Sequence, residues 1–242
     1  MTAPDYRSSK PIDPAERLIF ALDVPNRSDA LALVDQLGDA VRFYKLGLEF
    51  FLSGSFFPVL EELCSRDKKI FVDLKLFDIP ATVAGAVRQL NQYPIDLTTV
   101  HGNDAMLRAA AEAADSLKVL AVTALTSLDR GDLDALGFSC SVEDLVLSRA
   151  RRALEAGCAG VVSSGLEATR LRENLDHKLL VVCPGIRPVA NTDDQQRTVD
   201  VAQALRNGAD YLVIGRPIRA ADDPRGAASA IVETIHSVFD AP

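Results

Sequence analysis

Three charged residues lie close together in one otherwise apolar segment of the sequence. The segment I70-F-V-D-L-K-L-F-D-I-P80 contains Asp73, Lys75 and Asp78. Asp73 and Lys75 are two residues apart, so on a β-strand their side chains point to the same face. A buried ion pair that only stabilises the fold is one interpretation. Because charged side chains are rarely buried without a partner or a function, the segment is also the first candidate for a reaction site.

The neighbouring carboxylates determine what Lys75 can do. Nearby negative charge favours the protonated form of a lysine, so Lys75 is expected to be an ammonium group at pH 7. A Schiff-base lysine needs the opposite, a neutral amine produced by burial or by other cations. The pattern therefore predicts an acid that stabilises and then protonates a carbanion.

Short apolar runs alternate with longer amphipathic stretches along the 242 residues. Runs of this kind are typical of parallel strands that are buried on both faces. We expect eight strands, at residues 17–21, 43–46, 70–74, 97–100, 119–124, 160–162, 179–183 and 211–214. Helical patterns lie between them, for example at 28–37, 81–92, 104–116, 143–156 and 197–207. This order predicts an α/β protein, either a closed barrel or an open doubly wound sheet.

Polar residues follow nearly every predicted strand. They are Asp23, Lys45, Asp73 with Lys75, His101, Thr126 with Ser127, Ser163, Arg187 and Arg216. In a β/α barrel the C-terminal ends of the strands converge on one mouth, where the active site forms, whereas an open sheet would spread these residues along a crevice. We therefore favour a single (β/α)8 TIM barrel. The segment 126–142, after the fifth strand, is expected to form a mobile loop or short helices.

Length and composition indicate one domain. Residues 17–242 would form the barrel, and residues 1–16 a polar N-terminal tail that packs loosely, if at all. The net charge of -8 argues against a general affinity for nucleic acid or for anionic membranes. No apolar run approaches the ~18 residues of a membrane span, and no secretion signal is present, so we expect a cytoplasmic protein.

The cysteines and histidines give no sign of a metal site. The four cysteines are far apart and form no C-x-x-C pair, and the sequence has three histidines. We expect the cysteines to be buried thiols, and His101 to be a structural hydrogen-bonding residue and not a ligand.

A candidate anion site follows the last two predicted strands. The segment V182-C-P-G-I-R-P188 contains Arg187, and V213-I-G-R-P-I218 contains Gly215 and Arg216. Barrels frequently bind phosphate after their last two strands, through backbone N–H groups beside glycine and a cation. Arginine suits this role because its guanidinium binds phosphate in a bidentate way.

These segments together resemble the orotidine 5'-phosphate decarboxylase family. The segment D73-L-K-L-F-D-I-P80 with Thr82 looks like the family's D-x-K-x-x-D-I-P-x-T motif. Supporting segments occur in the family's order: A21-L-D, K45-L-G, T99-V-H, L125-T-S, P184-G-I-R-P and I214-G-R-P. A departure is Ser163, where many relatives have cysteine, and no catalytic role rests on that position.

The resemblance implies decarboxylation of orotidine 5'-phosphate to UMP without a cofactor or metal. Lys75 would protonate C6 of the pyrimidine within a charged array of Lys45, Asp73, Lys75 and Asp78. A homodimer would share its sites, because Asp78 and Thr82 of one subunit reach into the other. Substrate contacts would come from Asp23 and Lys45 at the ribose, Ile79 in the motif, Thr126 and Ser127 at the pyrimidine, and Pro184, Arg187, Gly215, Arg216 and Gln195 (or Gln196) at the phosphate.

Three other functions remain alternatives. A sugar-phosphate decarboxylase such as 3-keto-L-gulonate 6-phosphate decarboxylase has the same D-x-K-x-x-D core and uses Mg²⁺. The P184-G-I-R-P segment and the glutamine after it favour the nucleotide enzyme. A Schiff-base aldolase is disfavoured by the charges around Lys75. A catalytically silent phosphate-ligand binding protein would not need all four charged residues.

Overall fold

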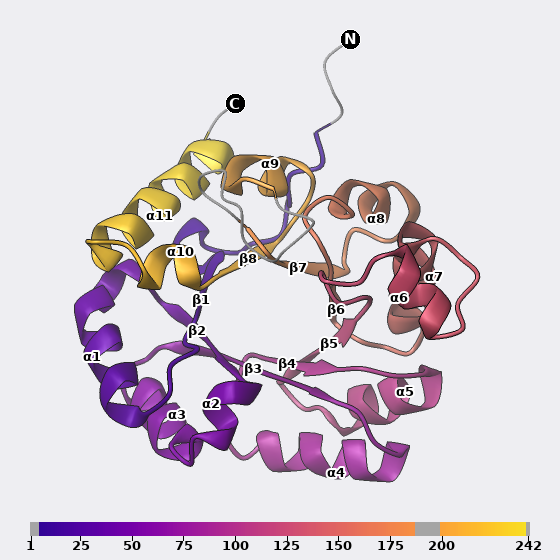
Figure 1. Cartoon of the computed structure of the whole chain (residues 1–242), viewed down its shortest axis with the longest axis horizontal. Coiled ribbons are helices and arrows are strands. Elements are labelled where there is room, and N and C mark those ends of the chain that lie inside the picture. The colour runs from indigo at the N-terminus through magenta and orange to yellow at the C-terminus, as the bar shows by residue number, and fades with distance from the viewer. Residues whose placement is uncertain (1–4, 187–198, 241–242) are drawn as a thin grey trace.

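The chain forms a closed barrel of parallel strands surrounded by helices (Figure 1). The computed structural model describes residues 5–186 and 199–240. Each of the eight strands pairs with the next one in the sequence, and β8 closes the barrel by pairing with β1. This topology confirms the predicted β/α barrel and excludes the open sheet.

All eight strands lie within two residues of their predicted bounds. They are β1 (Leu18–Ala21), β2 (Phe43–Gly47), β3 (Lys69–Leu76), β4 (Leu97–Val100), β5 (Lys118–Val122), β6 (Gly160–Val162), β7 (Leu180–Pro184) and β8 (Tyr211–Ile214). The agreement follows from burial on both faces, which makes each strand a short apolar run.

Helices cover the outside of the barrel. They are α1 (Arg27–Leu37), α2 (Leu48–Leu52), α3 (Phe56–Ser65), α4 (Pro80–Leu90), α5 (Asp104–Ala113), α6 (Arg130–Ala135), α7 (Val142–Glu155), α8 (Ala168–Asn174), α9 (Val201–Arg206), α10 (Arg216–Arg219) and α11 (Pro224–Asp240). Local chemistry sets several starts, because Asn26, Asn103 and Ser141 accept hydrogen bonds from the first turns of α1, α5 and α7. Pro80 begins α4, where the fixed φ of proline suits the first turn, and the segment 126–142 contains a short helix, α6, as expected.

Two apolar clusters hold the strands. One fills the barrel interior and consists of Ile19, Ala21, Phe43, Phe71, Leu97, Leu120, Leu180, Val182, Tyr211 and Val213. The other lies between the strands and the surrounding helices. Because successive side chains on a strand alternate between faces, seven of the eight strands contribute to both clusters, and Val162 of β6 packs against the interior one.

The N-terminal segment packs against the barrel more closely than the sequence suggested. Ser8 Oγ and Lys10 Nζ donate hydrogen bonds to the fully buried carboxylate of Asp210, which precedes β8. Arg172 on α8 pairs with the same carboxylate, at 2.7 Å. The expectation of a loosely packed tail is therefore wrong for these residues. A buried anion requires partners, and the segment supplies two of them.

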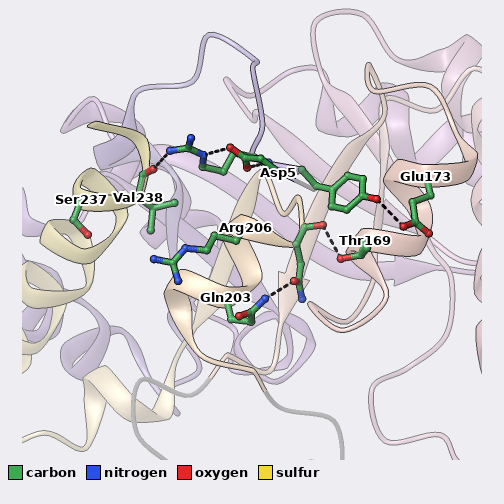
Figure 2. A pocket seen from close by; sticks show the side chains of 10 residues that line it. Asp5, Thr169, Glu173, Gln203, Arg206, Ser237 and Val238 are labelled. Carbon is green, nitrogen blue, oxygen red and sulfur yellow. Dashed lines mark hydrogen bonds and ion pairs between the residues drawn. The ribbon is translucent and has the colours of Figure 1, made fainter. Parts of the chain in front are cut away.

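A cavity of about 520 Å³ lies where this segment meets α8, α9 and α11 (Figure 2). Tyr6 donates to Glu173, and Arg7 donates to the carbonyl of Val238 across it. The cavity is beside residues that lead into β8, so it lies at the end of the barrel where the strands begin, away from the predicted reaction site. Within the described residues, no helix has the length and apolarity needed to cross a membrane.

Candidate active site

The barrel interior changes from apolar to charged toward the ends of β2 and β3. Lys45 comes two residues after interior Phe43, and Asp73 two after interior Phe71, so strand alternation turns both into the barrel. Strand pairing places them near each other, because Gly47 of β2 is opposite Asp73 of β3. Lys45 lies within β2, near the C-terminal end of the predicted second strand.

Four side chains form a line of alternating charge at this mouth. Lys45 Nζ lies 3.0 Å from Asp23 Oδ1 and 3.9 Å from Asp73 Oδ2, and Lys75 Nζ lies 2.9 Å from both oxygens of Asp73. The side chains of Lys45 and Asp73 are 11% and 14% exposed, so water screens them poorly. A Cβ at Gly47 would lie 2.7 Å from Lys45 Nζ and 3.0 Å from Asp23 Oδ1. Glycine at this position therefore leaves room for the ion pair of Lys45 with Asp23.

Lys75 has an uncommon backbone conformation. Its φ is +51°, in the left-handed region that non-glycine residues rarely adopt. The register of β3 against β4 also shifts here, since Val72 pairs with Thr98 and Leu76 with Val100. The strand is therefore irregular at Lys75, and in this bulged conformation Lys75 Nζ contacts the Asp73 carboxylate. Strain of this kind costs on the order of 1–3 kcal/mol and is concentrated at functional sites.

Thr99 belongs to this cluster, although it was not predicted as a site residue. It comes two residues after interior Leu97 and is fully buried. Its hydroxyl donates to Asp73 Oδ1, and the Lys75 backbone N–H donates to the hydroxyl. A polar residue in the buried run L97-T-T-V100 was the available sequence signal, but two adjacent threonines did not show which of them faces inward.

The second half of the motif does not join the array within one chain. Asp78, Ile79 and Thr82 are exposed, and Asp78 forms no ion pair in the part of the chain that the structure describes. Asp78 Oδ1 instead accepts a hydrogen bond from the backbone N–H of Ile79, just before α4. Within the described residues, this carboxylate therefore contacts its own loop and not the charged array.

The predicted pyrimidine and phosphate residues follow strands as expected. Thr126 and Ser127 come after β5, Pro184 ends β7, and Gly215 and Arg216 follow β8. Pro184 is paired with Val213 of β8, so the ends of these two strands adjoin. Gly185, directly after β7, has a φ of +77°, a left-handed conformation that glycine adopts readily. Arg187, Gln195 and Gln196 lie outside the described residues.

His101 is half-buried at the end of β4, and its ring packs edge-on against Phe77 at 5.6 Å. Burial lowers the pKa of His101, and the positive charges of Arg149 and Lys75 lower it further. The imidazole is therefore held in its neutral form beside the charged array. Within the described ranges, no group of three or more His, Cys, Asp or Glu side chains is arranged to hold a metal ion.

This environment predicts a specific pH dependence of stability. The unfolded chain binds a proton at His101 more readily than the folded chain, so stability is lost as pH falls from about 6.5 through the lowered pKa. We expect the difference in unfolding free energy between pH 7.5 and pH 5.5, measured with urea, to be smaller in His101→Gln than in the wild type. His236→Gln, at a more exposed site, is the control, and equal pH dependence in wild type and His101→Gln would contradict the assignment.

Ser163, at the end of β6, has a structural contact. Its hydroxyl donates to the buried carboxylate of Glu167 at 2.6 Å, and the same carboxylate accepts from the backbone N–H of Ser164. A cysteine at this position would be a much weaker hydrogen-bond donor. The contact supports the loop between β6 and α8.

The active sites of β/α-barrel enzymes lie at the mouth formed by the C-terminal ends of the strands, which is where this chain carries its array of alternating charges. Residues 16–231 match the sequence model of a family described as "Orotidine 5'-phosphate decarboxylase / HUMPS family". The chain belongs to this family.

Individual relatives cover almost the whole chain. A protein named orotidine 5'-phosphate decarboxylase from Methylococcus capsulatus is 60% identical over 240 residues, 98% of this chain and 99% of the relative. A protein of the same name from Xanthomonas euvesicatoria is 53% identical over 236 residues, 96% of this chain and 97% of the relative. The crystal structure of orotidine 5'-phosphate decarboxylase from Lactobacillus acidophilus superposes with a TM-score of 0.80 and 34% identity, over 91% of this chain and 99% of that chain.

Proposed function

We propose that this chain converts orotidine 5'-phosphate to UMP and CO2, the last step of de novo pyrimidine nucleotide biosynthesis. Family membership and relatives of that name at 53% and 60% identity support the reaction. The observation that carries the chemical assignment is the line of alternating charges formed by Asp23, Lys45, Asp73 and Lys75, whose two central members, Lys45 and Asp73, are largely buried. The free thiols of all four cysteines fit the cytoplasmic location that we include in the proposal.

The reaction is electrostatic in this proposal. Asp73 lies beside the substrate carboxylate, an unfavourable contact that is relieved as CO2 leaves. Lys75 then stabilises the carbanion at C6 and transfers its proton to that carbon. The 2.9 Å contacts between Lys75 and Asp73 support this assignment, because they hold the proposed proton donor beside the carboxylate that is proposed to adjoin the leaving CO2. No cofactor takes part.

The remaining contacts orient the nucleotide around this centre. Asp23 and Lys45 bind the ribose, and Thr126 and Ser127 bind the pyrimidine. The phosphate is bound by Pro184, Gly215 and Arg216, together with Arg187 and Gln195. The pairing of β7 with β8 supports this grouping, since it brings the ends of both strands together. Binding energy from the phosphate then serves to position the reacting carbon.

Replacing Arg216 tests the phosphate site. We expect Arg216→Ala to weaken UMP binding by about 10- to 100-fold, since a charge-assisted contact contributes roughly 1.5–3 kcal/mol. Isothermal titration calorimetry measures the affinity. The matched control is Arg219→Ala, at the other end of the four-residue helix α10, which should leave affinity unchanged. Unchanged affinity in Arg216→Ala would remove Arg216 from the phosphate site.

The proposed catalytic unit is a homodimer in which Asp78 and Thr82 complete the partner's site. Large apolar side chains support an interface, because many of the exposed ones belong to segments that follow strands at the mouth: Leu48, Phe51, Leu52, Phe77, Ile79, Leu125 and Leu166. Phe77 and Ile79 flank Asp78 directly. Burying them against a second copy would carry the carboxylate of Asp78 into the neighbouring barrel.

Subunit mixing tests the shared site. Lys75→Ala and Asp78→Ala homodimers should each be inactive, because every site lacks one group. After unfolding and refolding an equal mixture, half of the dimers contain one intact site, so about a quarter of wild-type activity should return. Lack of recovery with correctly sized dimers, measured by light scattering, would contradict sharing.

The substrate assignment is tested by the loss of orotidine 5'-phosphate absorbance in the presence of EDTA. We expect full turnover, because no metal takes part. The family description also covers the HUMPS group, and the sugar-phosphate decarboxylases considered above use Mg²⁺. Turnover that disappears with EDTA, or that occurs with 3-keto-L-gulonate 6-phosphate instead, would favour that alternative.

A further inference from the structure

The hydroxyl of Thr99 connects the two central residues of the charged array. It donates a hydrogen bond to Asp73 Oδ1 at 2.9 Å and accepts one from the Lys75 backbone N–H at 2.9 Å. A hydroxyl has one donor and two acceptor positions, so one small side chain can serve both residues. Thr99 is 0% exposed, so bulk water does not compete for either bond.

The backbone of Lys75 depends on this hydroxyl. The regular ladder between β3 and β4 stops after Val72 and resumes at Leu76, where the carbonyl accepts from His101 N. In the interval, the Lys75 N–H has the Thr99 side chain as its acceptor instead of a carbonyl of β4. The hydroxyl therefore completes the bulge that permits the left-handed conformation at Lys75.

The carboxylate of Asp73 also needs a neutral partner. The two lysines attract this carboxylate strongly. An ammonium is a compact charge with rotatable donors, however, so it does little to fix the orientation of the carboxylate. The rotation of an aspartate carboxylate about χ2 is broad, so attraction alone does not fix its plane. Thr99, on a rigid buried strand, fixes one oxygen in place.

We propose that Thr99 is a positioning residue that holds the Asp73 carboxylate and the Lys75 main chain in register for the reaction. This inference rests on the proposed function of the same site. Thr99 acts through its two partners and does not itself transfer a proton. Its loss should therefore lower kcat and leave the contacts that determine substrate binding in place.

Thr98 supplies a matched control one residue away. It is also 0% exposed and also hydrogen-bonded, but its hydroxyl donates to the Val72 carbonyl and its side chain lies on the opposite face of β4. We expect Thr99→Val to reduce kcat by about 10- to 100-fold with KM changed less than about threefold, the scale expected when reacting groups are misplaced. Thr99→Ser should restore kcat, and Thr98→Val should leave it unchanged.

A second measurement tests the geometry without activity. Hydrogen exchange of the Lys75 amide should be faster in Thr99→Val than in wild type, Thr99→Ser or Thr98→Val, because the hydrogen bond to the hydroxyl is lost. Thr99→Val with wild-type kcat and wild-type exchange, or an equal fall in kcat in Thr98→Val, would overturn the proposal. A wild-type protein that does not consume orotidine 5'-phosphate would instead overturn the proposed function, while amide exchange would still decide whether Thr99 holds Lys75.

Discussion

Lys75→Ala should lower kcat/KM for orotidine 5'-phosphate by on the order of 10⁴-fold or more. The variant loses both the electrostatic stabilisation of the C6 carbanion and the acid that protonates it, each of which contributes about 10²- to 10⁴-fold in other enzymes. UMP should still bind, because the proposed phosphate contacts come from the ends of β7 and β8 and do not involve Lys75. The absorbance assay gives the rate, and calorimetry gives the affinity.

Two further lysine variants make this result specific. Lys178→Ala, at an exposed side chain, controls for the loss of one positive charge and should retain wild-type kcat. Lys75→Arg keeps the charge and can still contact both Asp73 oxygens, but a guanidinium does not release its proton in proteins, so it should not restore activity. Substantial turnover by folded Lys75→Ala would rule out the proton-donor role.

Asp210→Ala should lower the free energy of unfolding by about 3–5 kcal/mol, because it leaves the buried guanidinium of Arg172 without its anionic partner. The same carboxylate accepts from Lys10 and from the backbone N–H of Val181, so the N-terminal segment and β7 are affected together. For a domain of this size the melting temperature should fall by roughly 2–4 °C per kcal/mol. Urea unfolding and calorimetry measure both quantities.

The stability loss in Asp210→Ala should not be accompanied by a loss of catalysis, because Asp210 is far along the barrel from the proposed active site. Asp210 precedes β8 and so lies at the end opposite the mouth, and kcat of the folded variant at low temperature should equal that of the wild type. Asp176→Ala removes an exposed carboxylate whose partner is Lys178 and should change stability by less than about 1 kcal/mol. A stability loss in Asp210→Ala no larger than that of the control would show that the buried cluster contributes little.

The sequence was sufficient to predict the barrel and the centre of the site. Strands buried on both faces are continuous apolar runs, so their positions could be determined from the local pattern of apolar residues. Asp73 and Lys75 were recognisable because charges interrupted one of those runs. The N-terminal segment was predicted poorly, because its polar residues looked like a solvated tail until Asp210 was found to be buried beneath them.

The sequence also did not show which of the two adjacent threonines of β4 points into the barrel. Side chains alternate between the two faces of a strand, but the pattern alone does not say which face is the inner one. Only the position of Leu97 inside the barrel shows that Thr99, and not Thr98, faces the charged array. The left-handed conformation of Lys75 was equally hidden, because nothing in its side chain favours a positive φ and the bulge arises from pairing between β3 and β4.

The sequence by itself therefore determined the order of elements, the charged residues and the strand ends at which they lie, since these depend on local pattern. The tertiary structure decided which side chains meet. Barrel closure and strand register set the 3.0 Å contact of Lys45 with Asp23 and placed Thr99 between Asp73 and Lys75. Contacts between residues far apart in the chain depend on register, and register is a property of the closed barrel as a whole.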